Sequence, residues 1–204
     1  MSLKKTFGDL QEKILQMLKE RLPGELTYHS YGHTLDVMES AIRLAREEGI
    51  DEKELELLKT AAAMHDSGYL YTRHEHEEKS CEIARELMAE EGVGEKDIER
   101  VCDLILATKL PNHPKNKLEE IICDADLDYL GRDDYFTIAQ RVFDEFLHFG
   151  TINSEKEWIG LQIRFLEAHR YYTPSANRLR EAKKQENLMK IRERAALYPK
   201  KSTA

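Results

Sequence analysis

Apolar residues recur at intervals of three and four along most of the chain. Leu35, Met38, Ile42 and Ala45 show this spacing clearly. Such spacing places an apolar stripe on one face of an α-helix. The alternating pattern typical of β-strands does not extend over a useful length, and no internal repeat is visible. The pattern therefore predicts an all-α protein of eight to ten helices.

Residues that favour helix ends fall between the apolar segments. Polar residues in capping positions indicate four helix starts, at Thr72-x-x-Glu75, Asn116-x-x-Glu119, Ser154-x-x-Glu157 and Thr173-Pro174. Glycine favours helix C-termini and indicates five ends, at Gly49, Gly92, Gly94, Gly131 and Gly150. Segment 109–117 contains two prolines and is expected to be a loop near the mouth of the functional site. The chain after Tyr198 is expected to be frayed.

Composition and charge narrow the class of protein. A chain of 204 residues with 41% hydrophobic content suits one globular domain, 1–204. The net charge of −8 disfavours binding to duplex nucleic acid, which requires clustered Lys and Arg. Because no apolar run approaches about 18 residues and the N-terminus lacks an apolar leader, we expect a cytoplasmic protein without a membrane span.

The three cysteines show neither disulfide nor zinc-binding spacing. Cys81, Cys102 and Cys123 are an odd set without a CxxC pair. We therefore expect reduced, buried thiols. Cys123 lies beside Asp124 in the sequence, so it is the one that can sit near a functional site.

His65-Asp66 is the pair that carries the most chemical information. It follows the apolar run 60–64, and His33 and Asp126 are available as further metal ligands. Two imidazole nitrogens and two carboxylate oxygens suit one divalent ion, such as Mn²⁺, Fe²⁺, Co²⁺, Ni²⁺, Zn²⁺ or Mg²⁺. The ligand charges then nearly cancel the charge of the ion.

The order His, His-Asp, Asp resembles that of the HD superfamily of metal-dependent phosphohydrolases. The resemblance is carried by Tyr28–Val37, by His65–Tyr69 and by Asp124–Gly131, and it covers about residues 26–132. A looser similarity to predicted HD phosphohydrolases extends over 172–188. The resemblance implies an HD-domain helical bundle with a metal-binding core at 26–132 and C-terminal helices at about 133–198 packed on it. It also implies His33, His65, Asp66 and Asp126 as the metal ligands.

Two carboxylates compete for the last ligand position. Asp124 and Asp126 are two residues apart and would point about 200° away from each other on a helix, so only one can be the ligand. The superfamily pattern places the ligand in an Ala-Asp pair, which favours Asp126. Asp124 is then a hydrogen-bond acceptor behind the ligands or a surface charge.

His29 lies four residues before His33, on the same face of any helix that includes both. The stretch Tyr28–Val37 is similar to a motif of cyclic nucleotide phosphodiesterases in which the first histidine protonates the leaving oxygen. This similarity implies that His29 is a general acid. The alternatives are that His29 holds the metal ligands in place or that its role is purely structural. Those enzymes carry another histidine after the His-Asp pair, where this chain has Ser67–Leu70.

His76 raises the question of a second ion. In binuclear HD proteins a histidine opening the next helix binds the second ion, and His76 matches that place. A further histidine is expected before a threonine in the following helix, where this chain has Ala107-Thr108. One ion is therefore favoured over two, and His76 or Glu77 can hold a water near the ion.

A phosphorylated substrate also requires cationic side chains. Lys109, Arg132 and Arg73 are the candidates for binding the substrate phosphate, although such residues are more often solvated surface charges. The expected substrate is small and nucleotide-like. Nucleotide phosphomonoesters are favoured over cyclic nucleotides.

The function expected from these parts is metal-dependent hydrolysis of a phosphoester. Asp66 or Asp126 orients or deprotonates the attacking water, and His29 protonates the departing oxygen. The alternative is a non-catalytic, metal-containing protein that binds a nucleotide for regulation. Apolar residues in 135–195 can pack on the core or on a second subunit, so the oligomeric state stays open.

Overall fold

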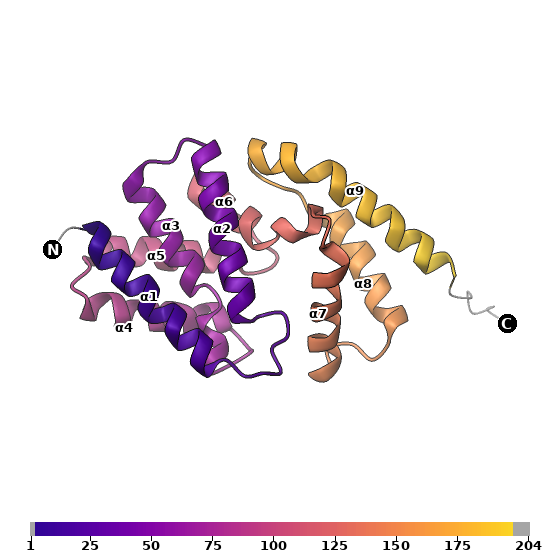
Figure 1. Cartoon of the computed structure of the whole chain (residues 1–204), viewed down its shortest axis with the longest axis horizontal. Coiled ribbons are helices and arrows are strands. Elements are labelled where there is room, and N and C mark those ends of the chain that lie inside the picture. The colour runs from indigo at the N-terminus through magenta and orange to yellow at the C-terminus, as the bar shows by residue number, and fades with distance from the viewer. Residues whose placement is uncertain (1–2, 198–204) are drawn as a thin grey trace.

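The computed structural model describes residues 3–197, which form nine α-helices, two short 3-10 helices and no strand. This confirms the predicted all-α fold (Figure 1). In chain order the elements are α1 (Leu3–Arg21), α2 (Tyr31–Glu47), α3 (Glu52–Met64), η1 (Ser67–Leu70), α4 (His76–Glu90), α5 (Glu95–Ala107), α6 (Lys117–Asp126), η2 (Asp128–Gly131), α7 (Tyr135–His148), α8 (Glu155–Ala168) and α9 (Pro174–Ala196).

Three of the four predicted helix starts are capped as expected. The side chains of Asn116, Ser154 and Thr173 accept hydrogen bonds from the first turns of α6, α8 and α9. The prediction at Thr72 was wrong, because Glu75 adopts a left-handed backbone conformation (φ 52°) and α4 begins only at His76. The Thr72 hydroxyl bonds the backbone of His74 instead.

The predictions for the glycines are likewise confirmed at some positions and wrong at another. Gly49, Gly92 and Gly150 follow α2, α4 and α7 with positive φ, as helix C-termini favour. Gly94 is the N-cap of α5, so it begins a helix and does not end one. Gly131 closes η2 where a Cβ atom would lie 2.3 Å from the backbone oxygen of Arg180, so the close approach of α9 requires glycine there.

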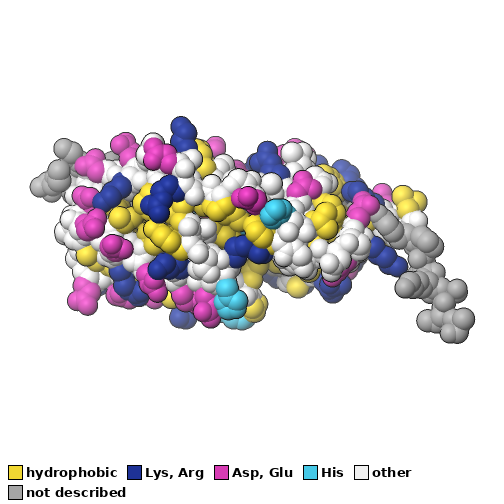
Figure 2. Space-filling model, turned by 90° about the horizontal axis from the view of Figure 1, so that it is seen from below, with side chains coloured by type: hydrophobic (Ala, Val, Ile, Leu, Met, Phe, Trp, Pro, Cys, Tyr) yellow, Lys and Arg dark blue, Asp and Glu magenta, His cyan; other side chains and the backbone are white. Residues whose placement is uncertain are grey.

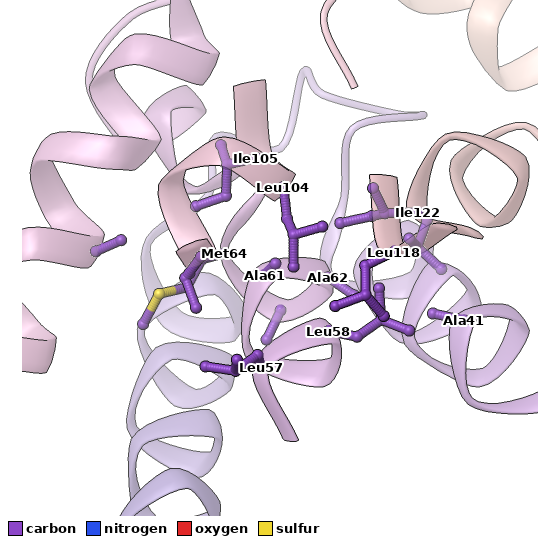
Figure 3. Close-up of a cluster of buried hydrophobic side chains, with 14 of the residues drawn as sticks. Ala41, Leu57, Leu58, Ala61, Ala62, Met64, Leu104, Ile105, Leu118 and Ile122 are labelled. Atoms are coloured by element: carbon purple, nitrogen blue, oxygen red, sulfur yellow. The ribbon is translucent and has the colours of Figure 1, made fainter. Parts of the chain in front are cut away.

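The buried apolar side chains form two clusters. The larger one lies among α1 to α6 and includes Leu44, Leu58 and Ile105 (Figure 3 shows part of it). The smaller one is built from η2, α7, α8 and α9 around Leu130 and Leu166. We call α1 to α6 the first lobe, and η2 with α7 to α9 the second lobe; they lie side by side in Figure 1. That the chain is one domain, with 133–198 packed on the HD core, stays a prediction.

Polar side chains join the two lobes close to the end of α6. Asp124 accepts hydrogen bonds from the backbone N–H groups of Tyr172 and Thr173, each at 2.8 Å. Asp128 accepts hydrogen bonds from Arg43 of α2 at 2.7 Å and from Arg180 of α9 at 2.8 Å. The segment that carries Asp126 is therefore fixed on both sides.

The remaining predictions concern cysteines, charge and membranes. Cys81, Cys102 and Cys123 are free and buried, as predicted. Figure 2 shows acidic and basic side chains interspersed on one face of the molecule. None of the described helices is long and apolar enough to cross a membrane. The predicted fraying after Tyr198 lies outside the described residues.

Candidate metal centre

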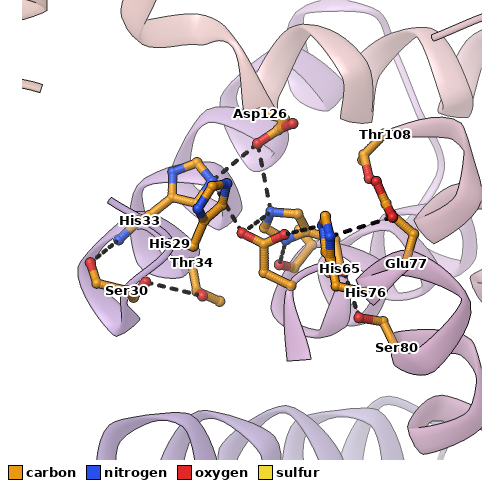
Figure 4. Close-up of polar contacts among 12 residues, drawn as sticks. His29, Ser30, His33, Thr34, His65, His76, Glu77, Ser80, Thr108 and Asp126 are labelled. Atoms are coloured by element: carbon orange, nitrogen blue, oxygen red, sulfur yellow. Dashed lines mark hydrogen bonds and ion pairs between the residues drawn. The ribbon is translucent and has the colours of Figure 1, made fainter. Parts of the chain in front are cut away.

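Three helix ends bring the four expected ligands together, and Figure 4 labels three of them, His33, His65 and Asp126. His33 lies in the first turn of α2, whose N-cap Ser30 accepts the His33 N–H. The buried apolar face of α3 ends at Met64, so His65 and Asp66 leave the helix end together. Asp126 is the last residue of α6. The residues that begin or end each helix thus position ligands that are distant from one another in the sequence.

The donor atoms converge on one point. Atoms of His33, His65 and Asp66 lie within 4.8 Å of one another. Asp126 Oδ1 lies 3.1 Å from His33 Nε2 and 3.6 Å from His65 Nε2. His65 is 1% exposed and Asp66 is 6% exposed. The four residues therefore form a largely buried set of two imidazoles and two carboxylates.

Hydrogen bonding prepares His65 to act as a ligand. Its Nδ1 donates to the backbone oxygen of Ala62 at 2.9 Å, which leaves a lone pair on Nε2. His65 Nε2 and Asp66 Oδ2 are both buried and lie 3.2 Å apart, but neither atom makes a well-oriented hydrogen bond among the described residues. Orphaned buried polar atoms are costly, and a cation between them would satisfy both. The donor set therefore fits a divalent ion.

The protonation of the centre reflects its concentrated negative charge. Burial acts to lower the pKa of His65, but the carboxylates of Asp66 and Asp126 raise this pKa well above its usual value. Burial likewise acts to raise the pKa of Asp66 and of Asp126, but the imidazoles hold both pKa values below the usual range. Without a metal, the carboxylates thus favour a proton on His65 where a cation would otherwise bind.

Asp124 and Asp126 occupy different environments. Asp126 faces the imidazoles, whereas Asp124 faces away and bonds the backbone and hydroxyl groups of the segment before α9. Burial raises the pKa of Asp124 to about 6, and its hydrogen bonds with Thr173 and Tyr172 oppose this rise. The structure brings Asp126 to the cluster and gives Asp124 a contact between the lobes.

His76 and Glu77 adjoin the other side of Asp66. His76 Nε2 lies 3.3 Å from Asp66 Oδ1, and His76 Nδ1 lies 3.4 Å from Glu77 Oε2. Asp66 Oδ2, by contrast, faces His33 and His65. The two oxygens of Asp66 therefore face different imidazoles, Oδ1 that of His76 and Oδ2 those of His33 and His65.

Glu145 of α7 is the site residue that the sequence analysis missed. It is 3% exposed and accepts the backbone N–H groups of Tyr28 and His29 at 2.8 and 3.1 Å. The same carboxylate pairs with His29 Nδ1, and the His29 ring stacks on Tyr69 at 4.4 Å. The available signal was a glutamate on the buried face of an amphipathic helix, three residues after Val142.

Glu145 also affects the charge of His29. Burial acts to lower the pKa of His29, but the hydrogen bond that its ring donates to Glu145 and the nearby Asp66 and Asp126 raise this pKa above its usual value. Because Glu145 pairs with Nδ1, Nε2 is the ring nitrogen available to a bound molecule. These contacts favour the protonated form of His29 and fix the orientation of its ring.

A cavity of about 740 Å³ connects this centre with the second lobe. Its lining includes Asp66 and Asp126 as well as residues of α7 and α8. Volumes of about 300–1,000 Å³ are typical of small-molecule sites. The centre is therefore accessible to a ligand of nucleotide size.

The three cations predicted to bind phosphate lie in different places. Lys109 and Arg73 line the cavity. Lys109 pairs with Glu78, and the Arg73 guanidinium lies 3.6 Å from the centre of the Phe149 ring. Arg132 does not line the cavity and bonds Asp36 and Asp134, each at 2.6 Å.

Comparison with solved structures supports the fold. A predicted HD superfamily hydrolase from an uncultured Thermotogales bacterium aligns with TM-score 0.63 and 21% identity over 91% of each chain. YpgQ of Bacillus subtilis, in complex with ADP, aligns with TM-score 0.64 and 19% identity over 95% of this chain and 97% of YpgQ. A protein from Lactobacillus plantarum aligns with TM-score 0.65 and 16% identity over 97% and 100% of the respective chains.

Comparison with families identifies the domain. No curated protein matches the chain significantly. Residues 30–128 match the HD domain family, and this range contains all four residues of the candidate centre. Residues 30–128 of the chain are thus identified as an HD domain.

Proposed function

We propose that the protein is a metal-dependent phosphohydrolase that cleaves a phosphoester of a small, nucleotide-like substrate. The observation that carries this proposal is the pair of orphaned atoms, His65 Nε2 and Asp66 Oδ2, at a centre that opens into the 740 Å³ cavity. A buried set of nitrogen and oxygen donors at one point suits a cation. The same donors beside a ligand-sized cavity suit catalysis.

His33, His65, Asp66 and Asp126 would hold one divalent ion. Such an ion supplies positive charge to a phosphate oxygen and makes a water more acidic. Mixed nitrogen and oxygen ligands suit Mn²⁺, Fe²⁺, Co²⁺, Ni²⁺, Zn²⁺ or Mg²⁺. A second ion would use Asp66 Oδ1 and His76, but this side offers fewer buried ligands, so we propose a single ion.

The remaining steps use the protein's own side chains. Asp66 or Asp126 orients the attacking water or accepts its proton. His29, held at Nδ1 by Glu145, donates a proton from Nε2 to the departing oxygen. Lys109 and Arg73 line the cavity and bind the substrate phosphate. Arg132 is already paired with Asp36 and Asp134, so its proposed role is to hold η2 in place.

The nucleotide-like substrate rests on two supports. The cavity has the size of a nucleotide site. The Bacillus subtilis protein of the same fold is in complex with ADP. A small phosphorylated molecule with a ring is therefore the substrate class that we propose.

The test measures phosphate release from mono-, cyclic and polyphosphate nucleotides with Mn²⁺, Mg²⁺ or Co²⁺. Asp66→Asn should lower turnover at least about a hundredfold, because even residues behind metal ligands cost up to that factor. The matched control is His74→Ala, a cavity residue whose side chain is 88% exposed, and it should retain activity. Circular dichroism verifies that both variants fold.

Two results would contradict the proposal. Turnover by Asp66→Asn near that of the wild type would exclude Asp66 from the reaction. Stoichiometric metal and saturable nucleotide binding without any turnover would favour the alternative, a non-catalytic regulatory protein.

A further inference from the structure

The cavity divides into a charged half and an uncharged half. All of its charged and histidine residues come from the first lobe and the loops beside it, among them Asp66, Lys109 and Arg73. The residues that α7 and α8 contribute carry no charge. Those that matter here are Ala139, Val142, Phe146, Trp158, Gln162 and Phe165. We call this part of the cavity the apolar chamber.

Helix periodicity explains why the chamber is apolar. Ala139, Val142 and Phe146 are spaced by three and four residues, so they share one face of α7. Trp158, Gln162 and Phe165 share one face of α8 in the same way. Both faces line the cavity. A phosphate or a sugar hydroxyl would lose hydration in the chamber without gaining an ionic partner.

The chamber presents aromatic rings in fixed positions. Trp158 makes an edge contact with Phe146, with ring centres 5.9 Å apart. On the side nearer the metal centre, Tyr129 and Tyr135 stack at 6.0 Å with 7° between their planes. Aromatic walls favour a planar ring, because stacked and edge contacts add to the apolar burial.

Gln162 gives the chamber one polar contact. It is 7% exposed, and its Oε1 accepts a hydrogen bond from the Tyr135 hydroxyl at 2.8 Å. The Nε2 amide has no hydrogen-bond partner among residues 3–197. With one amide atom held by Tyr135, the other is available to a ligand that carries a complementary edge.

We propose that the apolar chamber binds the substrate's planar aromatic ring, and that Gln162 recognises a polar edge of this ring while the phosphate lies at the metal centre. Asp126 and the residues of the apolar chamber line the same cavity of about 740 Å³, so phosphate and ring can bind at the same time. This inference rests on the proposed function for the position of the phosphate. It adds that α7 and α8 determine which phosphoesters are substrates.

The test measures binding of the ring alone, without turnover. Trp158 is the only tryptophan in the chain, so ligand in the chamber should change its fluorescence. The probes are adenosine, which has a ring with a polar edge, benzyl alcohol, which has a ring without one, and ribose, which has no aromatic ring. We expect a saturable change with adenosine, a weaker one with benzyl alcohol and none with ribose, both in the wild type and in Asp66→Asn.

Two variants and a matched control locate the binding. Ala139→Phe fills the chamber and should weaken adenosine binding at least about tenfold. Gln140→Phe places the same side chain on an exposed neighbour that does not line the cavity and should leave binding unchanged. Gln162→Leu removes the polar contact and should weaken adenosine binding about three- to tenfold without weakening benzyl alcohol binding.

Three outcomes would overturn the inference. These are no saturable change with either aromatic probe, equal binding by Ala139→Phe and Gln140→Phe, and tight adenosine binding that Gln162→Leu leaves unchanged. If Ala139→Phe does not fold, Gln162→Leu still decides. Phosphoester hydrolysis by a protein that binds no ring would refute this inference alone, whereas ring binding without hydrolysis would refute only the proposed function.

Discussion

Asp126 and Asp128 are two residues apart, yet their negative charges are balanced in different ways. Asp128 is 1% exposed and bonds two guanidinium groups, from Arg43 and Arg180. Asp126 faces two imidazoles, beside an Asp66 oxygen that has no hydrogen-bond partner. A guanidinium is always charged, whereas the charge of an imidazole depends on whether it is protonated. Asp128, whose charge is paired with two guanidinium groups, therefore stabilises the fold, and the cluster around Asp126 is suited to a cation.

The largest expected effect is a loss of stability when Asp128 is replaced. Asp128→Ala should lower the free energy of unfolding by about 3–5 kcal/mol, because it removes a buried carboxylate and leaves two partly buried guanidinium groups without their partner. Asp126→Asn, measured without metal, should cost less than half as much, because Asp126 helps to raise the pKa of His65 and without this charge His65 can lose its proton. Urea unfolding followed by circular dichroism measures both. Equal losses would show that the two carboxylates do not differ.

The next effect comes from metal. At a free concentration about a thousand times its Kd, an ion that binds only the folded state adds about 4 kcal/mol of stability. We expect Mn²⁺ or Co²⁺ to raise the melting temperature of the wild type and of Asp128→Asn. The same ions should leave Asp66→Asn nearly unchanged. A similar rise in Asp66→Asn would place the binding site elsewhere.

A third buried carboxylate, Glu145, should affect catalysis more than stability. Glu145→Gln keeps the shape but removes the charge that helps to raise the pKa of His29 and orients its ring. We expect kcat to fall about ten- to hundredfold, with KM and metal content close to those of the wild type. Steady-state kinetics and elemental analysis test this. An unchanged kcat would make Glu145 a purely structural link between the lobes.

The smallest expected effect is a pH-dependent loss of stability at His169, whose pKa is shifted in the opposite direction from that of His65. Burial and the neighbouring Lys184 lower the pKa of His169 to about 4, whereas carboxylates raise the pKa of His65. Because the unfolded chain binds a proton on His169 more readily, this residue destabilises the fold as pH falls from about 6.5 to about 4. Since His169 is partly exposed, the loss should be about 1 kcal/mol.

His169→Asn should flatten this part of the pH profile, since asparagine cannot be protonated there. Urea unfolding at several pH values between 4 and 7 measures the difference from the wild type. His74→Asn, at a highly exposed histidine, is the control and should follow the wild type. An identical slope in His169→Asn and the wild type would refute the lowered pKa.

Much of the fold could be predicted because it depends on local patterns. The apolar spacing and the caps at Asn116 and Ser154 involve neighbouring residues only. The start of α4 was misplaced because the left-handed conformation of Glu75 has no signature in the sequence. The division into two apolar clusters was not predicted either, because it depends on which helices pack together.

Some residues of the site could likewise be predicted from the sequence, and others could not. His33, His65, Asp66 and Asp126 could be named because their order matches a known motif, and the structure brings them together. Glu145 could not be named, because its contact with His29 spans 116 residues of sequence. Arg132 was a candidate for phosphate only because its partners, Asp36 and Asp134, were unknown.

The most direct test of the central claim is a metal-binding isotherm for the protein stripped of metal. Calorimetric titration with Mn²⁺, Co²⁺ and Zn²⁺ should show one tight site per chain. That site should weaken at least about a hundredfold in Asp126→Asn and much less in Asp124→Asn, whose side chain faces away from the imidazoles. The absence of a tight site, or equal weakening in the two variants, would contradict the assignment of this centre.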